Sequence, residues 1–220
     1  MTANARILDL GLRPYREVWE LQRRTREAVR EGLEPDTWII VEHEPVITLG
    51  RQAKRENLLL SQEQLAAQGV DVVEVERGGD VTYHGPGQLV VYPIRRLARF
   101  REVVPFVRSL ESAAIACCAR FGVAGERWGD HAGVWVGGKC ICAIGLAVRR
   151  MVSMHGLALN VSTALDYDRL INPCGLTERG ITSLFAEAGR EVSMHEARTA
   201  LVDELSRAFD VTLVEERQVA

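Results

Sequence analysis

The stretch RGGDVTYHGPGQ, residues 77–88, decides how the rest of the chain is interpreted. Its twelve positions include four glycines, one proline, one histidine and one arginine. It is too irregular for a strand and too glycine-rich for a helix, and it lies between two runs with the composition of strands. Long irregular connections often carry binding or catalytic residues, so we expect a functional role. The alternative is a structural connection whose polar residues are incidental.

The composition is that of one soluble globular domain. The chain has 220 residues, of which 47% are hydrophobic and 26% are charged. No repeat or linker divides it, so residues 1–220 are expected to form a single domain. The formal net charge of −3 argues against a protein that binds nucleic acid by bulk electrostatics. A local cluster, Arg95, Arg96, Arg99 and Arg101, fits either an acidic protein partner or a solvated helix start.

The chain shows no membrane or export signal. No segment approaches 18 uninterrupted apolar residues, and the N-terminus lacks the apolar core of a signal peptide. The five cysteines include no CxxC pair, which argues against a disulfide scaffold and fits a reducing compartment. We therefore expect a cytoplasmic protein that does not associate with a membrane.

Hydrophobic periodicity predicts a mixture of helices and strands. Helices are expected at residues 15–31, 61–68, 105–121 and 193–209, and strands at 37–43, 46–50, 70–76, 88–94, 133–137, 140–148 and 155–161. Ser61 with Gln64, and Ser193 with Glu196, have the spacing of capping boxes. Because helices and strands do not alternate regularly, the predicted class is α+β, with a largely antiparallel or mixed sheet.

The glycine-rich stretch does not match the common nucleotide motifs. It lacks the Lys-Ser/Thr of a P-loop and the spacing GxGxxG. Its glycines, Gly78, Gly79, Gly85 and Gly87, allow the backbone to bend and to approach a ligand closely. Polar groups that such a wall would present are those of Arg77, Thr82, Tyr83, His84 and Gln88.

Cys174 is the second candidate for chemistry. It lies between Pro173 and Gly175 in INPCGL, residues 171–176, outside any periodic apolar run. A free cysteine is often a small buried hydrophobe, which is the alternative here. A nucleophile would need a nearby cation or base, because an unperturbed thiol with a pKa of about 8.5 is mostly protonated at neutral pH.

Four segments together resemble a known family. The segments RGGDVTYHGPGQLVVY, GVWVGGKCICAIG, HGLALNV and INPCG, in this order and at this spacing, are similar to those of the octanoyltransferases of lipoate biosynthesis. EHEPVITLGR, residues 42–51, also fits the family's N-terminal part, so the resemblance covers most of the chain. It implies the fold shared with the catalytic domains of biotin and lipoate protein ligases, which is a single α+β domain with a mixed or antiparallel sheet and flanking helices.

The resemblance also implies a two-step acyl transfer. The Cys174 thiolate would take octanoyl from octanoyl-acyl carrier protein, and a lysine of a lipoyl-domain protein would then accept it. Such acceptors are the 2-oxoacid dehydrogenase subunits and the glycine cleavage carrier protein. No cofactor or metal is implied. The walls of the acyl site would be Arg77, Gly78, Gly79, Asp80, Val81, Thr82, Tyr83, His84, Ala143, Ile144, Gly145, His155, Gly156, Leu157 and Ala158.

This chain departs from the family at the lysine that activates the cysteine. Family members carry this lysine in a pattern like K-[I/L]-C-A-I-G. In this chain Cys140 occupies the lysine position, and the nearby Lys139 lies one residue before it. Strict alternation along a strand would place Cys140 and Cys142 on one face and Lys139, Ile141 and Ala143 on the other. Three interpretations compete. In the first, a bulge brings Lys139 into the site. In the second, the family lysine is replaced and the thiol is poorly activated. In the third, Cys140 has its own role, such as a disulfide with Cys174.

The sequence gives weaker support to the remaining candidate residues and to rival functions. His84 and His155 lie inside the motifs, His43 could line the same cavity, and the four tryptophans are interpreted as packing residues. Rival functions are an ATP-dependent lipoate or biotin ligase, a weakly active module that binds acyl-protein, and, more remotely, a cysteine hydrolase.

Overall fold

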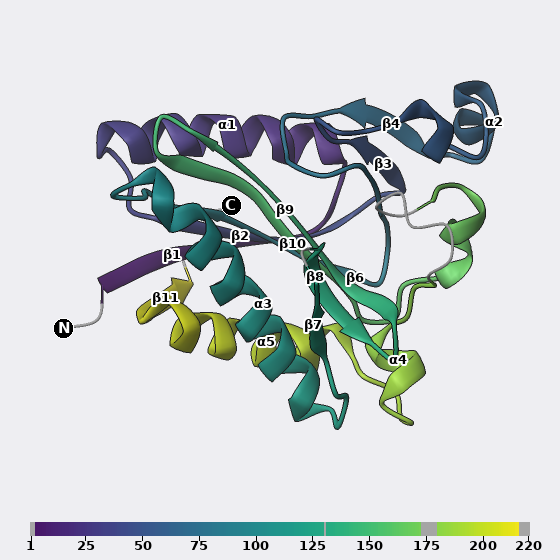
Figure 1. Ribbon diagram of the computed structural model, residues 1–220. Coiled ribbons are helices and arrows are strands. Elements are labelled where there is room, and N and C mark those ends of the chain that lie inside the picture. Colours follow the sequence, from purple (N-terminus) through teal and green to yellow (C-terminus); the bar gives the residue numbers. More distant parts are fainter. Residues whose placement is uncertain (1–2, 130, 173–179, 216–220) are drawn as a thin grey trace.

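A mixed sheet forms the centre of the molecule (Figure 1). The computed structural model describes residues 3–129, 131–172 and 180–215, and within them eight strands pair in the order β11-β1-β2-β6-β10-β9-β8-β7. Their bounds are β1 Ala3–Arg13, β2 Thr37–His43, β6 Gln88–Ile94, β7 Glu126–Trp128, β8 His131–Val136, β9 Lys139–Arg149, β10 Val152–Asn160 and β11 Val211–Glu215. Strand β1 is parallel to both β2 and β11, and the remaining pairs are antiparallel.

A smaller sheet and the helices complete the architecture. The small sheet has the order β4-β3-β5, with β3 Val46–Leu49, β4 Asp71–Glu74 and β5 Val81–His84. The helices are α1 Tyr15–Glu31, α2 Gln62–Ala67, α3 Val103–Arg120, α4 Leu184–Glu187 and α5 Met194–Phe209, with short 3-10 turns at Arg55–Asn57, Phe100–Glu102 and Leu165–Arg169. None of these described helices is long and apolar enough to cross a membrane.

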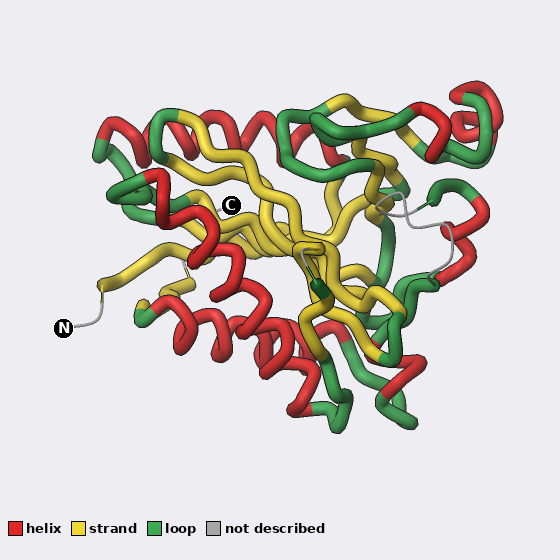
Figure 2. Tube along the Cα trace, in the orientation of Figure 1, coloured by secondary structure: helices red, strands yellow, loops and turns green. Residues whose placement is uncertain are grey.

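The large sheet separates two sets of elements (Figures 1 and 2). Helices α3 and α5 cover one face, where Leu110, Leu201 and Ile141 belong to one buried apolar cluster. Helix α1 covers the other face and packs through Val18 and Val29 onto residues such as Met154. A third cluster lies between the small sheet and the segment around Tyr167 and Ile181. The fold therefore encloses polar motif residues between the two sheets.

The local sequence signals predicted the helices well. Helix α1 follows Pro14 and ends at Gly32, whose φ of 74° is the left-handed conformation that glycine adopts without strain. Both predicted capping boxes, at Ser61 and Ser193, are present. The α+β class is confirmed as well, and β8 and β9 form a hairpin.

Two predictions about strands were incomplete. The glycine-rich stretch is not wholly irregular, because its residues Val81–His84 form β5, which pairs with β3. Strands β1, β7 and β11 were missed. The partners of β1 are β2 and the distant β11, so its pairing depends on segments that the local sequence does not reveal.

Candidate active site

Three of the motif segments meet around one cavity. The cavity has a volume of about 50 Å³ and lies between the glycine-rich stretch, the middle of β9 and the middle of β10. Its lining residues are Tyr15, Arg77, Gly78, Gly79, Asp80, Thr82, His84, Tyr92, Ala143, Ile144, Gly145, His155, Gly156, Leu157 and Ala158. Every residue that the sequence assigned to the acyl site is in this set except Val81 and Tyr83.

A second, smaller cavity adjoins the first. It has a volume of about 20 Å³ and shares Thr82, Ala143 and Ala158 with its neighbour. Val81, Tyr83 and Cys140 line this second cavity, together with Gln88, Asn160, Tyr167 and Ile181. The two cavities are therefore neighbours with these three residues in common, and the second one reaches Cys140.

Close backbone contact explains the glycine at position 145. The N–H of Gly78 donates to the carbonyl oxygen of Leu146 at 2.9 Å, which holds the glycine-rich stretch against β9. A Cβ atom on Gly145 would lie 3.1 Å from the carbonyl oxygen of Gly78 and 3.2 Å from Cδ of Arg77. This wall of the cavity is consequently made of backbone rather than of side chains.

The charged residues of the motif hold the loop in place. Arg77 is buried, and its guanidinium donates to both the side-chain and the carbonyl oxygen of Thr48 and to the carbonyl of Gly78. Asp80 accepts from the N–H groups of Lys54 and Val81 and from the side-chain amide of Asn57. Both side chains line the cavity, but their polar atoms are used largely for the loop itself.

Strict alternation along β9 was the wrong expectation. Val134 pairs with Cys142 and Trp135 with Cys140, so Ile141 is an extra residue in β9, that is, a β-bulge. Ile141 and Cys142 both pack into the cluster beneath α3 and α5, whereas Cys140 lies in the opposite cluster, against which Ala143 also packs. The bulge therefore places Cys140 on the same face as Ala143.

The bulge exists, but Lys139 lines neither cavity, and whether it reaches Cys174 stays untested because Cys174 lies outside the described residues. The Lys139 side chain is exposed, whereas Cys140 is 8% exposed and lines the second cavity. The backbone of Cys140 is fixed on both sides, because its N–H donates to Gly180 and its carbonyl accepts from Thr182. Cys174 lies outside the described residues, so its distance from Cys140 stays untested, as does a disulfide between them.

A buried chain of hydrogen bonds joins the two cavities. Nδ1 of His84 lies 2.7 Å from Oε1 of Gln88, and Nε2 of Gln88 donates to Oδ1 of Asn160 at 2.9 Å. Asn160 in turn donates to the hydroxyl of Tyr167 and to the carbonyl of Thr182. Since Oε1 of Gln88 only accepts, Nδ1 of His84 carries the proton and Nε2 is unprotonated in the neutral ring.

Burial keeps the imidazoles of this region neutral. It lowers the pKa of His84 to about 3, with a further contribution from the neighbouring His43. His43 does not line the cavity but lies behind it, with Nε2 2.9 Å from the hydroxyl of Tyr92. Burial lowers the pKa of His43 to about 4. At neutral pH this region therefore presents uncharged polar rings.

The residues that sequence reasoning missed come from α1 and β6. Tyr15 and Tyr92 line the cavity and are 4% and 3% exposed, and burial raises the pKa of both hydroxyls. Trp19 was interpreted as a packing residue, but its indole N–H donates to Glu76 at 3.0 Å. The spacing of Tyr15, Trp19 and Gln22, at i, i+4 and i+7, places all three on one helical face and is the signal that could have identified them.

His155 has an unusual backbone for a residue within a strand. Its φ is +58°, a left-handed conformation that is uncommon for residues other than glycine. Such strain costs on the order of 1–3 kcal/mol and persists only where surrounding contacts hold it. Its ring is 2% exposed, and burial lowers its pKa.

Among the described residues, no group of three or more histidine, cysteine, aspartate or glutamate side chains is arranged to hold a metal ion. What the arrangement offers is a small hollow walled by backbone, apolar side chains and neutral polar rings, with the charged groups of Arg77 and Asp80 engaged in hydrogen bonds within the loop. Such a site suits a largely apolar chain.

Comparison with known proteins gives a consistent result. The lipoyl protein ligase A/B catalytic domain matches residues 14–206. The octanoyltransferase of Syntrophobacter fumaroxidans is 44% identical over 211 residues, which cover 96% of this chain and 92% of that protein.

Solved structures agree on the fold. A bipartite lipoate protein ligase from Thermoplasma acidophilum aligns with a TM-score of 0.76 at 18% identity, covering 98% of this chain and 87% of that one. The biotin protein ligase of Aquifex aeolicus aligns with a TM-score of 0.51 at 11% identity, covering 93% and 68%. The predicted likeness of fold to lipoate and biotin protein ligases is confirmed.

Proposed function

Because the chain belongs to the octanoyltransferases of the lipoyl protein ligase A/B catalytic-domain family, and is therefore an acyltransferase of lipoate biosynthesis, we propose its donor, intermediate and acceptor. The donor is octanoyl-acyl carrier protein, and the octanoyl group is held as a thioester on Cys174. The acceptor is a lysine of a lipoyl-domain protein, such as a 2-oxoacid dehydrogenase subunit or the glycine cleavage carrier protein. The supporting observation is that the glycine-rich stretch, β9 and β10 line one common cavity.

The proposed first step is a thioester exchange. The Cys174 thiolate attacks the carbonyl carbon of the octanoyl thioester, and the carrier leaves as its own thiolate, which then takes a proton. The tetrahedral intermediate carries its negative charge on the former carbonyl oxygen, where backbone N–H groups of the glycine-rich walls would stabilise it. Covalent catalysis of this kind divides one difficult transfer into two easier ones.

In the second step the lysine side chain of the lipoyl domain attacks the enzyme thioester. A carbon–nitrogen bond forms, the bond from carbon to Cys174 sulfur breaks, and the lysine loses a proton. The product is an octanoyl amide and a regenerated thiol. The bound acyl chain would displace water from the cavity, which favours transfer to lysine over hydrolysis.

The experiment is intact-mass measurement after the protein is mixed with octanoyl-acyl carrier protein, with peptide mapping of the adduct. We expect one octanoyl group on Cys174, which is discharged when a lipoyl domain is added. Cys174→Ala should remain unmodified, whereas Cys118→Ala, a change at a buried cysteine outside the cavities, should still be loaded. Release of the acyl group to water would indicate a hydrolase, and acylation that requires ATP and releases pyrophosphate would indicate a ligase.

The position of Cys140 supports a second candidate, a module that binds the acyl carrier with little turnover. Residue 140 faces the second cavity, and the activating lysine of the family is replaced there. This candidate predicts that the protein binds octanoyl-acyl carrier protein without forming an adduct.

A further inference from the structure

The deep end of the first cavity is formed by aromatic rings. Gly78, Ile144 and Gly145 are partly exposed and lie at the open side, whereas Tyr15, Tyr92 and His155 are each less than 5% exposed. A chain that enters past the glycines would therefore meet these rings last. Their positions determine how far it can extend.

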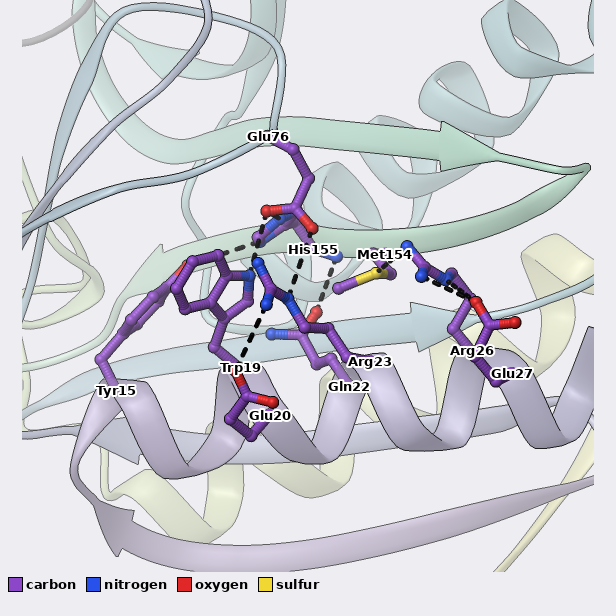
Figure 3. Close-up of polar contacts among 10 residues, drawn as sticks. All are labelled: Tyr15, Trp19, Glu20, Gln22, Arg23, Arg26, Glu27, Glu76, Met154 and His155. Carbon is purple, nitrogen blue, oxygen red and sulfur yellow. Dashed lines mark hydrogen bonds and ion pairs between the residues drawn. The ribbon is translucent and has the colours of Figure 1, made fainter.

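His155 is placed in this wall by its backbone. His155 pairs with Leu146 of β9 in a continuous ladder, although its own φ is +58°. Its N–H donates to Oε1 of Gln22 on α1 at 2.8 Å (Figure 3). Gln22 is fully buried, so its carbonyl oxygen is directed at one buried N–H from a distant strand.

The ring of His155 is held by two further contacts. Its Nδ1 lies 3.4 Å from the hydroxyl of Tyr15, and its Nε2 lies 3.5 Å from Oε2 of Glu76. The Glu76 carboxylate also accepts from Trp19, whose ring lies 3.9 Å from the guanidinium carbon of Arg23. Figure 3 shows these α1 side chains directed toward His155 and Glu76.

We propose that His155 is the end wall of the acyl pocket and limits the length of the acyl chain, and that Gln22 is a positioning residue that holds His155 in place. This inference rests on the proposed octanoyl transfer and adds to it a determinant of chain length. Gln22 acts only through the backbone of His155. Its side-chain carbonyl accepts a hydrogen bond from the His155 N–H and so stabilises the left-handed backbone conformation of that residue.

The test measures equilibrium binding of octanoic and dodecanoic acids by calorimetry, since free acids cannot acylate a thiol. We expect the unmodified protein to bind octanoic acid at least tenfold more tightly than dodecanoic acid. His155→Gly suits the left-handed backbone and removes the ring, so it should reduce this preference to less than twofold. His155→Asn, which also tolerates that conformation, serves as a second variant if the glycine variant does not fold.

Gln22→Ala should weaken the preference because the ring is no longer held. In the background of His155→Gly, the same change should have no further effect on it, since glycine needs no help to adopt a positive φ. Thr25→Ala, at another buried position of α1, is the matched control. It should lower stability without changing the preference.

Three results would overturn the inference. They are an unchanged preference in His155→Gly, an effect of Gln22→Ala that persists in the glycine background, and a shift of equal size in Thr25→Ala. If the unmodified protein binds octanoic acid but transfers no octanoyl group, the proposed function fails and the wall is still tested by binding. If it binds neither acid yet forms the octanoyl adduct on Cys174, the inference about the wall fails and the proposed function stands.

Discussion

Residue 140 is the position where the resemblance to the family leads us to expect a lysine and where this chain has a cysteine. Its backbone is fixed between β8 and the segment around Gly180, so the direction of its side chain is set by the strand and not by the side chain itself. The β-bulge at Ile141 turns that direction toward the cavity. A different side chain at this position would therefore point to the same place.

Cys140→Lys should accelerate loading of Cys174 by octanoyl-acyl carrier protein. An ammonium group near a thiol lowers the thiol pKa, and a shift of about two units raises the thiolate fraction roughly twentyfold at neutral pH. The nucleophilicity of a thiolate falls with its pKa, so we expect an increase of roughly three- to twentyfold in rate. Rapid-quench mass measurement of the adduct gives this rate.

Lys139→Ala is the matched control for that change. The Lys139 side chain is exposed, so its removal should leave loading unchanged. Loss of loading in Lys139→Ala would show that the neighbouring lysine serves the thiol after all. An unaltered rate in Cys140→Lys would show that the thiol is not limited by activation.

At the scale of elements, the motif segments act through how closely their backbones approach. Gly145 in β9 faces both Gly78 and Arg77. Gly145→Ala should therefore cost about 1–3 kcal/mol of unfolding free energy, because the methyl group forces the glycine-rich stretch away from β9. Urea denaturation measures this cost, and the same variant should show slower octanoyl loading.

Gly122→Asn provides the comparison for Gly145→Ala. Gly122 has a φ of +75° and open space where a Cβ would lie, and asparagine tolerates this conformation. Its unfolding free energy should change by less than that of Gly145→Ala. If both variants were equally stable and equally active, close approach would not matter at position 145.

The sequence predicted those elements whose causes are local. The helix at 15–31 is set by Pro14, by its apolar spacing and by Gly32, and the two capping boxes could be identified from residues three apart. The bulge could not be predicted in this way. It arises from the register between β8 and β9, which depends on both strands and on the turn that joins them.

The same limit applies to the candidate site. The motif residues that line the cavity could be predicted because their sequence segments resemble those of a known family. The spacing on α1 places Tyr15 and Gln22 on one helical face, but that this face meets β10 beside the cavity is a tertiary arrangement that neighbouring residues do not encode. The left-handed backbone of His155 has the same origin, since a contact from a distant helix holds it.

At the scale of the whole molecule, three histidines are buried between the two layers that enclose the cavity. His43, His84 and His155 all have lowered pKa values, chiefly because burial disfavours the charged ring. In the unfolded chain each titrates near its usual pKa of about 6.5. Between that value and about pH 4, the unfolded state therefore binds more protons than the folded state.

The folded state should accordingly lose stability as the pH falls below about 6.5. Each such histidine contributes a slope of up to about 1.4 kcal/mol per pH unit. We expect the thermal midpoint to be nearly constant from pH 8 to 7 and to fall steeply from pH 6.5 to 5. Scanning calorimetry across this range measures the slope.

His43→Asn should reduce that slope by the contribution of one titrating histidine, up to about 1.4 kcal/mol per pH unit. Asparagine does not titrate and can still donate to the carbonyl of Arg13. His195→Asn is the control, because that histidine is exposed on the surface of α5. A slope that is unchanged in His43→Asn would place the acid sensitivity elsewhere in the molecule.

The extra residue in β9 also makes the length of the β8–β9 hairpin a determinant of which side chain faces the cavity. Deletion of Cys140 would remove the bulge, so Ile141 would pair with Trp135 and take the cavity-facing position, while Lys139 would still pair with Val136 beside the turn. A one-residue insertion or deletion in this hairpin would therefore exchange the side chain at the cavity, a change that comparison of substitutions alone would overlook.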